Sequence, residues 1–463
     1  MTERILFLTG HLARPRLEKV LGETDALGFA WSVFDVGVKV AALMTEPIIS
    51  RRLPRPVEAS RVMVPGRCRA DLDRLTAEFG VPFVRGPDEL KDLPAFFGKR
   101  GRPLDLSRYD MRIFAEIVDA SALSVEAIVA RAASMRTAGA DVIDLGCLPD
   151  TPFPHLEDAV RALRAAGHAV SVDSAATEEL RRGAMAGAQF LLSLSEATLD
   201  VASDTGAVPV LISAQHGDLA SLLRAAEAAD RRAIAAILDP VLDPIHFGFM
   251  DSLARYAELR RRLPAAEILM GTGNLTELTD ADSGGVTATL LGLCSELSIH
   301  NLLVVQVSPH TRRTIQEHDA ARRMMFAARE DSSIPKDYGG ALLSLHDRKP
   351  FPNTPAEIAE LAAEVKDANF RIETAEDGIH IYNRHGHHVA NNAMSLFANL
   401  GVEQDGPHAF YLGTELMKAE IAWLLGKRYA QDAPLDWGCA ADRPAEDLTR
   451  LAAAGHTLRA SKK

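Results

Sequence analysis

The pattern of hydrophobic and polar residues divides the chain into three parts. In residues 1–105, short apolar runs alternate with segments whose apolar residues recur every three or four positions. Such alternation of strands and helices predicts a small α/β domain with a parallel sheet. The expected strands are residues 5–8, 30–35, 61–64 and 82–84, and the expected helices are residues 15–27 and 71–79. Residues 98–107, rich in glycine, proline and charge, predict a linker.

From about residue 109 to about residue 329 the alternation becomes regular, and we count eight strand–helix cycles. Each strand is short and rich in Val, Ile and Leu, as expected when both faces of a sheet are covered. The expected strands are residues 112–118, 142–145, 169–173, 190–194, 208–212, 233–238, 268–271 and 301–307. Eight such units in about 220 residues predict a (β/α)8 TIM barrel, and an open doubly wound sheet is the alternative.

The alternation stops after about residue 331. The expected elements beyond it are a helix at 355–368, a hairpin formed by 370–374 and 379–383, and helices near 391–400 and 412–428. The chain is therefore expected to be α/β, with a TIM barrel flanked by an N-terminal α/β domain and a C-terminal α+β domain. The expected boundaries are 1–105, 106–332 and 333–463.

Composition narrows the functional classes. With a net charge of −12, the chain lacks the excess of positive charge expected of a nucleic-acid-binding protein. Four scattered cysteines fit a reducing cytosol. The N-terminus lacks the cationic region of a signal peptide, and no apolar run approaches the roughly 20 residues of a membrane helix. We expect a cytoplasmic protein with no nucleic-acid or membrane partner. Its oligomeric state stays open, a homodimer included.

Polar residues follow each of the eight expected barrel strands, and four of these strand ends carry a carboxylate. Chemistry in such barrels takes place at the carboxyl ends of the strands. A single aspartate there is usually a turn or a helix cap. Several converging carboxylates repel one another unless they bind a metal or accept hydrogen bonds from a ligand rich in N–H donors. A pterin ring is such a ligand, and it suits Asp173, Asp239 and Asn274.

The loops after the seventh and eighth strands form the expected phosphate site. The first offers the backbone N–H groups of a glycine turn, and the second offers cationic side chains near a helix start, where cations are mildly unfavourable without an anion. The residues are Gly271, Thr272, Gly273, His310, Arg312 and Arg313. A strand-end glycine at Leu8-Thr9-Gly10-His11 is a second and weaker phosphate candidate, since such a segment is more often just a turn.

Several of these segments resemble the pterin-binding barrel superfamily, which holds dihydropteroate synthase and the methyltetrahydrofolate:corrinoid methyltransferases. They are AGADVIDLGC at 138–147, SVDS at 171–174, ILDP at 237–240 and the arginine loop VSPHTRRTI. With GNLTELTDADSGG, the arginine loop is most similar to dihydropteroate synthase-like proteins of tetrahydromethanopterin biosynthesis, which occur in methanogens and methylotrophs. The resemblance covers roughly residues 112–329.

The resemblance implies roles for individual residues. Asp173, Asp239, Asn274 and Ser193 would bind the pterin, while His310, Arg312 and Arg313 would bind a phosphate or diphosphate. Three segments depart from dihydropteroate synthases. EIVDASALS at 116–124 replaces Asn-Val-Thr-Pro-Asp-Ser-Phe-Ser, Leu192 or Ser193 replaces an asparagine, and GTGN at 271–274 replaces a lysine-containing segment. These departures argue against ordinary folate synthesis.

Our leading hypothesis is a transferase that joins a dihydropterin-methyl diphosphate to a ribosyl-arylamine phosphate. Asp119 and Asp173 are the catalytic candidates, and Asp119 or Glu116 would bind Mg²⁺. The N-terminal domain is a candidate for holding the larger nucleophile. The alternatives are a pterin-dependent methyltransferase with a corrinoid partner and a non-catalytic pterin-binding scaffold.

Two further groups are interpreted as structural. Asp110 precedes the first barrel strand, and Asp144 is expected to be buried against helix N–H groups. Four histidines surround the expected hairpin, but their spacing matches no zinc template, so a surface or interdomain role is expected. These histidines are His380, His385, His387 and His388.

Overall fold

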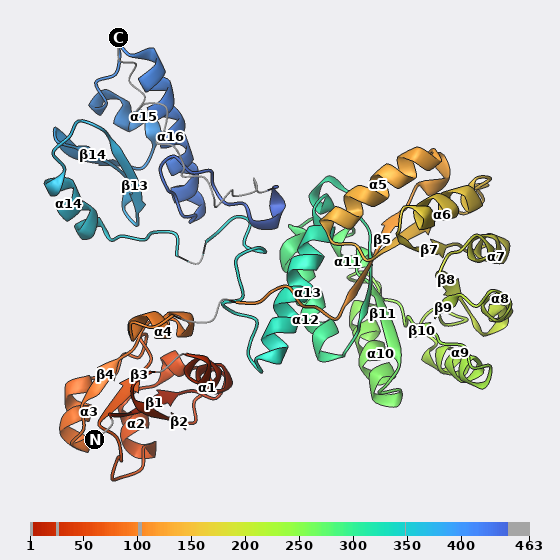
Figure 1. Cartoon of the computed structure of the whole chain (residues 1–463), viewed down its shortest axis with the longest axis horizontal. Helices are drawn as coiled ribbons and strands as arrows, with labels where there is room; N and C mark the ends of the chain where they lie inside the picture. Colours follow the sequence, from red (N-terminus) through yellow and green to blue (C-terminus); the bar gives the residue numbers. More distant parts are fainter. Residues whose placement is uncertain (1–2, 25–26, 101–103, 348, 443–463) are drawn as a thin grey trace.

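A computed structural model describes residues 3–24, 27–100, 104–347 and 349–442 of the protein. Its strands form three separate sheets (Figure 1). The first is a parallel sheet in the order β2-β1-β3-β4. Its strands are β1 Arg4–Thr9, β2 Ala30–Asp35, β3 Arg61–Val64 and β4 Phe83–Arg85. The sequence predicted all four of these strands.

Helices cover both faces of this N-terminal sheet. Apolar residues of α1 and α4 pack against one face, which includes Ile5 and Phe7 of β1. Apolar residues of α2 and α3 pack against the other, which includes Leu8 and Val62. The helices are α1 Arg14–Glu23, α2 Glu46–Arg52, α3 Leu72–Phe79 and α4 Leu93–Phe96. Helix α2 was not expected from the sequence.

The second sheet is a closed barrel of parallel strands in the order β10-β11-β12-β5-β6-β7-β8-β9, which confirms the predicted (β/α)8 TIM barrel. Its strands are β5 Arg112–Ile117, β6 Val142–Gly146, β7 Ala169–Asp173, β8 Phe190–Leu194, β9 Val208–Leu211, β10 Ile237–Leu238, β11 Glu267–Gly271 and β12 Asn301–Val304. Strand β10 is much shorter than the expected 233–238. The barrel interior is filled by a buried cluster that includes Phe114, Phe190 and Leu269.

Helices surround the barrel, and a larger apolar core lies between them and the strands. They are α5 Val125–Ala138, α6 Leu156–Ala165, α7 Thr177–Met185, α8 Asp200–Thr205, α9 Leu219–Arg231, α10 Phe249–Arg262, α11 Gly273–Thr276, α12 Ser283–Glu296 and α13 Thr314–Glu330. Short 3-10 helices are η1 Ala41–Leu43, η2 Leu90–Asp92, η3 Ala120–Ala122, η4 Glu196–Thr198, η5 Pro309–Thr311, η6 Phe397–Asn399 and η7 Gly438–Ala440.

A buried arginine of α13 forms hydrogen bonds and ion pairs at the amino end of the barrel. The guanidinium of Arg322 donates to the backbone oxygens of Met111 (2.7 Å) and Gly139 (2.9 Å), which lie just before β5 and β6. It also pairs with Asp141 and Asp319. The last turns of α13 therefore lie at the end of the barrel where the strands begin.

The third sheet is antiparallel, in the order β13-β14-β15. Its strands are β13 Arg371–Ala375, β14 Gly378–Asn383 and β15 Gly386–Ala390, and the helices around it are α14 Pro355–Glu364, α15 Ala393–Leu396 and α16 Gly406–Leu425. The expected hairpin is confirmed, whereas β15 was not expected. Among the described residues, every helix is too short or too polar to cross a membrane.

Two of the histidines pair inside this third sheet. His380 is buried, its Nδ1 lies 2.9 Å from Nε2 of His387, and its Nε2 lies 2.8 Å from an Asp377 oxygen. The expected surface role is therefore wrong for His380, because β14 carries it into the sheet core.

Candidate active site at the carboxyl ends of the barrel strands

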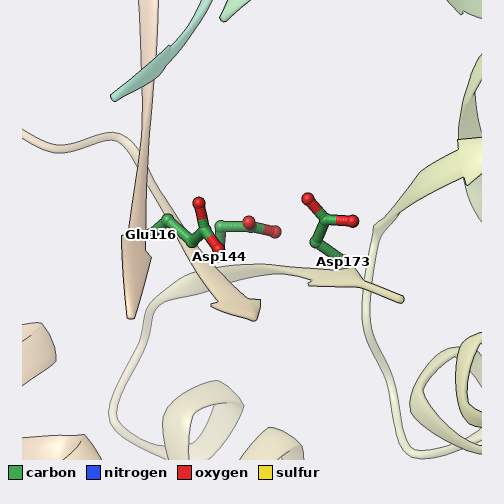
Figure 2. A group of neighbouring side chains, drawn as sticks. All are labelled: Glu116, Asp144 and Asp173. Atoms are coloured by element: carbon green, nitrogen blue, oxygen red, sulfur yellow. The ribbon is translucent and has the colours of Figure 1, made fainter. Parts of the chain in front are cut away.

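Three carboxylates gather at the carboxyl ends of neighbouring barrel strands. Glu116 lies on β5, Asp144 on β6 and Asp173 on β7, and an oxygen from each lies within 4.8 Å of the others. Figure 2 shows the carboxylate of Asp144 between those of Glu116 and Asp173. We call these residues the acidic triad.

Strand register explains why the three side chains meet. Glu116 is paired with Asp144, and Asp173 is paired with Gly146, two residues further along β6. Register partners on parallel strands face the same side of a sheet, and residues two apart on a strand share a face. All three carboxylates therefore point to one side, whereas Gly146 contributes no side chain between them.

Gly146 leaves room for the Glu116 carboxylate. A Cβ atom at residue 146 would lie 2.5 Å from Oε1 of Glu116 and 3.1 Å from Cα of Val118. Both contacts are too close for a side chain. The absence of a side chain here lets Glu116 reach across toward Asp173.

Asp144 is fully buried, and only one of its two carboxylate oxygens has a hydrogen-bond partner among the described residues. Its Oδ1 accepts a hydrogen bond from the Ser171 hydroxyl, and its Oδ2 has no partner within the described parts of the chain. Burial raises the pKa of Asp144 well above its ordinary value, and the charges of Asp173 and Glu116 raise it further. A protonated Asp144, or a cation that compensates its charge, is therefore favoured over a bare buried carboxylate.

The pKa values of Asp173 and Asp239 are also raised. The pKa of Asp173 is raised to about 7 by burial, then by the charges of Glu116 and Asp239. Burial raises the pKa of Asp239 to about 6, although its carboxylate accepts hydrogen bonds from the Val241 N–H (2.8 Å) and the Tyr256 hydroxyl (2.9 Å). The barrel thus brings Asp173 and Asp239 to one shared electrostatic site.

Asp119 lies outside this site. Its side chain is half exposed and pairs with Arg131 at 2.9 Å, just after β5 at the start of η3. Asp144, which we expected to be structural and to lie against helix N–H groups, belongs to the acidic triad instead. The signal in the sequence was a lone carboxylate inside an otherwise apolar strand, since a buried charge requires a partner.

The other two predicted pterin ligands lie on neighbouring loops. Asn274 is exposed on α11, and its Nδ2 donates to the backbone oxygen of Leu242 at 2.7 Å, which joins the loops after β11 and β10. Ser193 lies where the pairing of β8 with β9 shifts between Leu192 and Leu194. Its neighbour Leu192 is the register partner of Asp173.

The predicted phosphate loops are held together by side chains. Thr272 is buried, and its hydroxyl contacts the Leu303 oxygen (3.2 Å) and Nε2 of His318 (3.0 Å). Nε2 of His310 lies 3.0 Å from the Thr276 oxygen. In contrast, a Cβ built on Gly271 would meet no atom within 4 Å, whereas one on Gly273 would meet Val305 at 3.0 Å. Open space for a ligand therefore adjoins Gly271.

The two arginines of the predicted phosphate site differ in the partners of their side chains. Arg312 donates to the Pro309 oxygen at 3.2 Å and is otherwise exposed. Arg313 donates to the Cys439 oxygen (3.0 Å) and pairs with the exposed Asp442 (2.7 Å). The C-terminal segment of the described chain thus reaches the predicted phosphate loop and pairs with one of its cations.

Glu277 organises these loops, and sequence reasoning did not select it. Its carboxylate accepts from the N–H groups of Val307 (2.8 Å) and Ser308 (2.9 Å) and from the Thr311 hydroxyl (2.7 Å). Burial alone would raise the pKa of Glu277, but these hydrogen bonds outweigh it and lower the pKa overall. An ionised Glu277 therefore fixes the loop after β12 to the loop after β11.

Comparisons with known proteins give three kinds of similarity. The family DUF6513, described as a family of unknown function, matches residues 3–88. An uncharacterized protein of Methanocaldococcus jannaschii is 24% identical over 526 residues, covering 93% of this chain and 99% of its own length.

Among solved structures, the dihydropteroate synthase of Yersinia pestis with a pterine-sulfa conjugate is 20% identical with a TM-score of 0.38, covering 50% of this chain and 97% of that chain. The dihydropteroate synthase of Thermus thermophilus is 21% identical with a TM-score of 0.36, covering 49% of this chain and 96% of that chain.

Proposed function

We propose that this protein is a pterin-binding transferase that joins a dihydropterin-methyl diphosphate to a ribosyl-arylamine phosphate in tetrahydromethanopterin biosynthesis. The observation that carries the proposal is the pair Asp173 and Asp239, whose pKa values are raised to about 7 and 6 at one end of the barrel. Carboxylates crowded in this way are relieved by a ligand that presents several N–H donors. The edge of a pterin presents such donors, and the motif resemblance points to the same two residues.

The proposed reaction needs no covalent nucleophile. A C–N bond forms between the arylamine nitrogen and the methylene carbon of the pterin, the C–O bond to the diphosphate breaks, and the amine loses one proton. The requirements are therefore to orient both reactants and to stabilise the departing diphosphate. Asp173 and Asp239 would orient the pterin, and Asp173, with a pKa near neutrality, is also the candidate acceptor for the amine proton.

The diphosphate would lie beside the loops after β11 and β12. Open space adjoins Gly271, and the exposed Arg312 and the partly exposed Arg313 supply positive charge. In this proposal Arg313 exchanges its contact with Asp442 for a diphosphate oxygen. Because Asp442 is exposed to solvent, breaking its pair with Arg313 would cost only about 0–1 kcal/mol.

The acidic triad fits a divalent cation with oxygen ligands. The unpartnered, buried Oδ2 of Asp144 is the observation that supports this fit among the described residues, because an ionised carboxylate there requires compensation. Of these residues, Glu116 and Asp144 would hold Mg²⁺, which prefers carboxylate and phosphate oxygens, and Asp173 beside them would stay available to the pterin. When bound, Mg²⁺ would neutralise charge on the diphosphate. We assign this role to the triad rather than to Asp119, whose carboxylate pairs with Arg131.

A condensation assay tests the proposal. The full chain would be incubated with dihydropterin-methyl diphosphate, Mg²⁺ and the ribosyl-arylamine phosphate, with p-aminobenzoate as the control amine. We expect diphosphate release and a condensed pterin with the first amine and much less with the second. Asp173→Asn and Asp239→Asn should lose this activity, whereas Asp200→Asn, an exposed aspartate on α8, should retain it. Absence of product with both amines would refute the transferase assignment.

A second candidate is a pterin-dependent methyltransferase that acts with a corrinoid partner. Asn274 favours it, since this residue stands where a folate-making synthase carries a lysine, and its amide is anchored to Leu242 beside the Asp239 loop. Methyl transfer from a methyl-pterin to cobalamin, with no condensation of an arylamine, would support this second function. Pterin binding without either reaction would instead support a non-catalytic scaffold.

A further inference from the structure

A cavity lies in the N-terminal domain, apart from the site at the barrel. Its volume is about 240 Å³, and it opens at the carboxyl edge of the sheet, where β1, β3 and β4 end. The strand order β2-β1-β3-β4 places successive connections on opposite sides of β1. Loops diverge at such a reversal, and open α/β sheets bind ligands in the crevice that results. The volume is just below the roughly 300–1,000 Å³ of common ligand pockets, so it suits a small molecule.

Glycines bring the loops around this cavity close together. A Cβ on Gly10, after β1, would lie 2.7 Å from the Val38 oxygen. A Cβ on Gly66, after β3, would lie 2.6 Å from the Asp88 nitrogen. Each loop thus packs backbone against backbone with its neighbour, which gives the cavity a built rim. Thr9, from the weak phosphate candidate Leu8-Thr9-Gly10-His11, lines the cavity.

The walls of the cavity are mainly apolar, and its mouth is cationic. Phe7, Leu17 and Met63 are buried residues of the wall. Lys39 and Lys336 reach the mouth from the loop after β2 and from the segment after the barrel, and both are exposed. Neither ammonium group has a hydrogen-bond or ion-pair partner among the residues that the structure describes.

The three acidic residues of the cavity lining already have partners. Glu89 pairs with Lys91 at 3.2 Å, and Asp88 lies 4.0 Å from Arg67. Asp337 is also engaged in an interaction of its own. Lys39 and Lys336 are therefore the charged residues of the lining that remain available to a ligand. An apolar interior beneath such ammonium groups is complementary to an organic anion with an apolar body.

The chain that follows the barrel completes the cavity. Ser333, Ile334 and Lys336 line it, although they come after α13 and far from the N-terminal domain in sequence. Arg16 of α1 secures this segment, because its guanidinium pairs with Asp331 and donates to the Tyr338 hydroxyl at 2.7 Å. A ligand in the cavity would therefore contact both the N-terminal domain and the barrel tail.

This cavity lies at the opposite end of the barrel from the acidic triad. Residues 331–337 follow α13, whose Arg322 and Arg329 bond to Met111 and Asp110, just before β5 begins. The triad lies at the strand ends. This placement argues against our expectation that the N-terminal domain holds the second reactant of the barrel.

We propose that the N-terminal cavity binds a small organic anion, consisting of an apolar ring or chain that carries a phosphate or carboxylate group. The apolar part enters between β1 and β3, and the anionic group lies between Lys39 and Lys336. This inference is independent of the pterin function proposed above.

Isothermal titration calorimetry on the full chain tests the proposal, with phenyl phosphate and benzoate as probes and benzyl alcohol as the neutral counterpart. At least one anionic probe should bind, and benzyl alcohol should bind much more weakly. Lys39→Met and Lys336→Met should each weaken binding by about two- to fivefold, as expected for exposed charge pairs. Lys366→Met, which removes an exposed lysine of the C-terminal domain, is the matched control and should change nothing.

A cavity-filling variant separates this site from adventitious anion binding. Ala42 lines the cavity, so Ala42→Phe should abolish probe binding while pterin binding at the barrel persists. The proposal is overturned if neither anionic probe binds, or if binding is equal in the wild type, the lysine variants and Ala42→Phe. Melting temperatures of all variants would exclude unfolding as the cause.

Discussion

Glu116 and Asp144 are register partners on adjacent parallel strands, and their carboxylates share one space with that of Asp173. Neighbouring carboxylates in a buried site resist simultaneous ionisation. The barrel mouth therefore holds either bound protons or a compensating ligand. We therefore expect the stability of the protein to depend on both pH and divalent cations.

The acidic triad makes stability depend on pH. Asp173 has a folded pKa of about 7, above its unfolded value of about 3.9. Its proton therefore favours the folded state, so this contribution is complete below the unfolded pKa and is lost as the pH rises through about 7. Asp173→Asn, which does not titrate, should gain stability relative to the wild type between about pH 4 and 7 and then level off.

Urea unfolding at a series of pH values in metal-free buffer measures this gain. Taking the difference between variant and wild type cancels titrating groups that are not coupled to Asp173, such as buried His318, whose pKa is lowered to about 4 by burial. A difference for Asp173→Asn that is flat or declines with pH would contradict the assignment.

Magnesium should stabilise the wild-type protein in a manner that depends on Asp144. At pH 8, above the pKa of about 7 of Asp173, Mg²⁺ should raise the melting temperature, because a ligand that binds only the folded state stabilises it. Asp144→Asn should lose most of this response, and Asp119→Asn should retain it. The reverse pattern, with Asp119 required and Asp144 dispensable, would return the metal site to the position first predicted from the sequence.

Gly146→Ala should displace the Glu116 carboxylate without removing a charged group from the acidic triad. The new methyl group would lie 2.5 Å from Oε1 of Glu116, so the carboxylate must move. We expect a loss of about 1–3 kcal/mol in the free energy of unfolding, as for other overpacked sites, together with a weaker response to Mg²⁺. Gly413→Ala on the exposed face of α16 meets no atom within 4 Å and should instead be neutral or stabilising.

Asp442 should compete with diphosphate for Arg313. Because Asp442 is exposed and pairs with Arg313 at 2.7 Å, Asp442→Asn should tighten diphosphate binding by up to about fivefold. Calorimetric titration with inorganic diphosphate measures the effect, and Glu403→Gln, a change at an exposed residue of the same domain, is the control. Unchanged affinity in Asp442→Asn would remove Arg313 from the proposed diphosphate site.

The sequence predicted the barrel well because its strands are continuous apolar runs separated by amphipathic helices. It failed where the local pattern was weak. Strand β15 reads Gly-His-His-Val-Ala, which lacks an apolar alternation, and its pairing with β14 became evident only in the structure. Helix α2 is short and carries a proline in its first turn, so it resembled a loop.

The candidate site was predictable only in part. Asp173 and Asp239 were selected because each stands where an apolar strand ends, and their role in pterin binding stays a prediction. Asp144 was misinterpreted because its role depends on Glu116, a register partner that the sequence does not reveal. Arg313 was selected for the predicted phosphate site, but its partner Asp442 lies 129 residues away and gives no local signal.

Binding of a reduced pterin tests the central claim most directly. Calorimetry with 6-hydroxymethyl-7,8-dihydropterin should show binding to the wild type. Asp173→Asn and Asp239→Asn should each weaken it by roughly 10- to 150-fold, because each variant removes a charged hydrogen-bond acceptor worth about 1.5–3 kcal/mol. Asp119→Asn should bind like the wild type. Equal affinity in all four proteins, or no binding to the wild type, would contradict a pterin site at the carboxyl ends of this barrel.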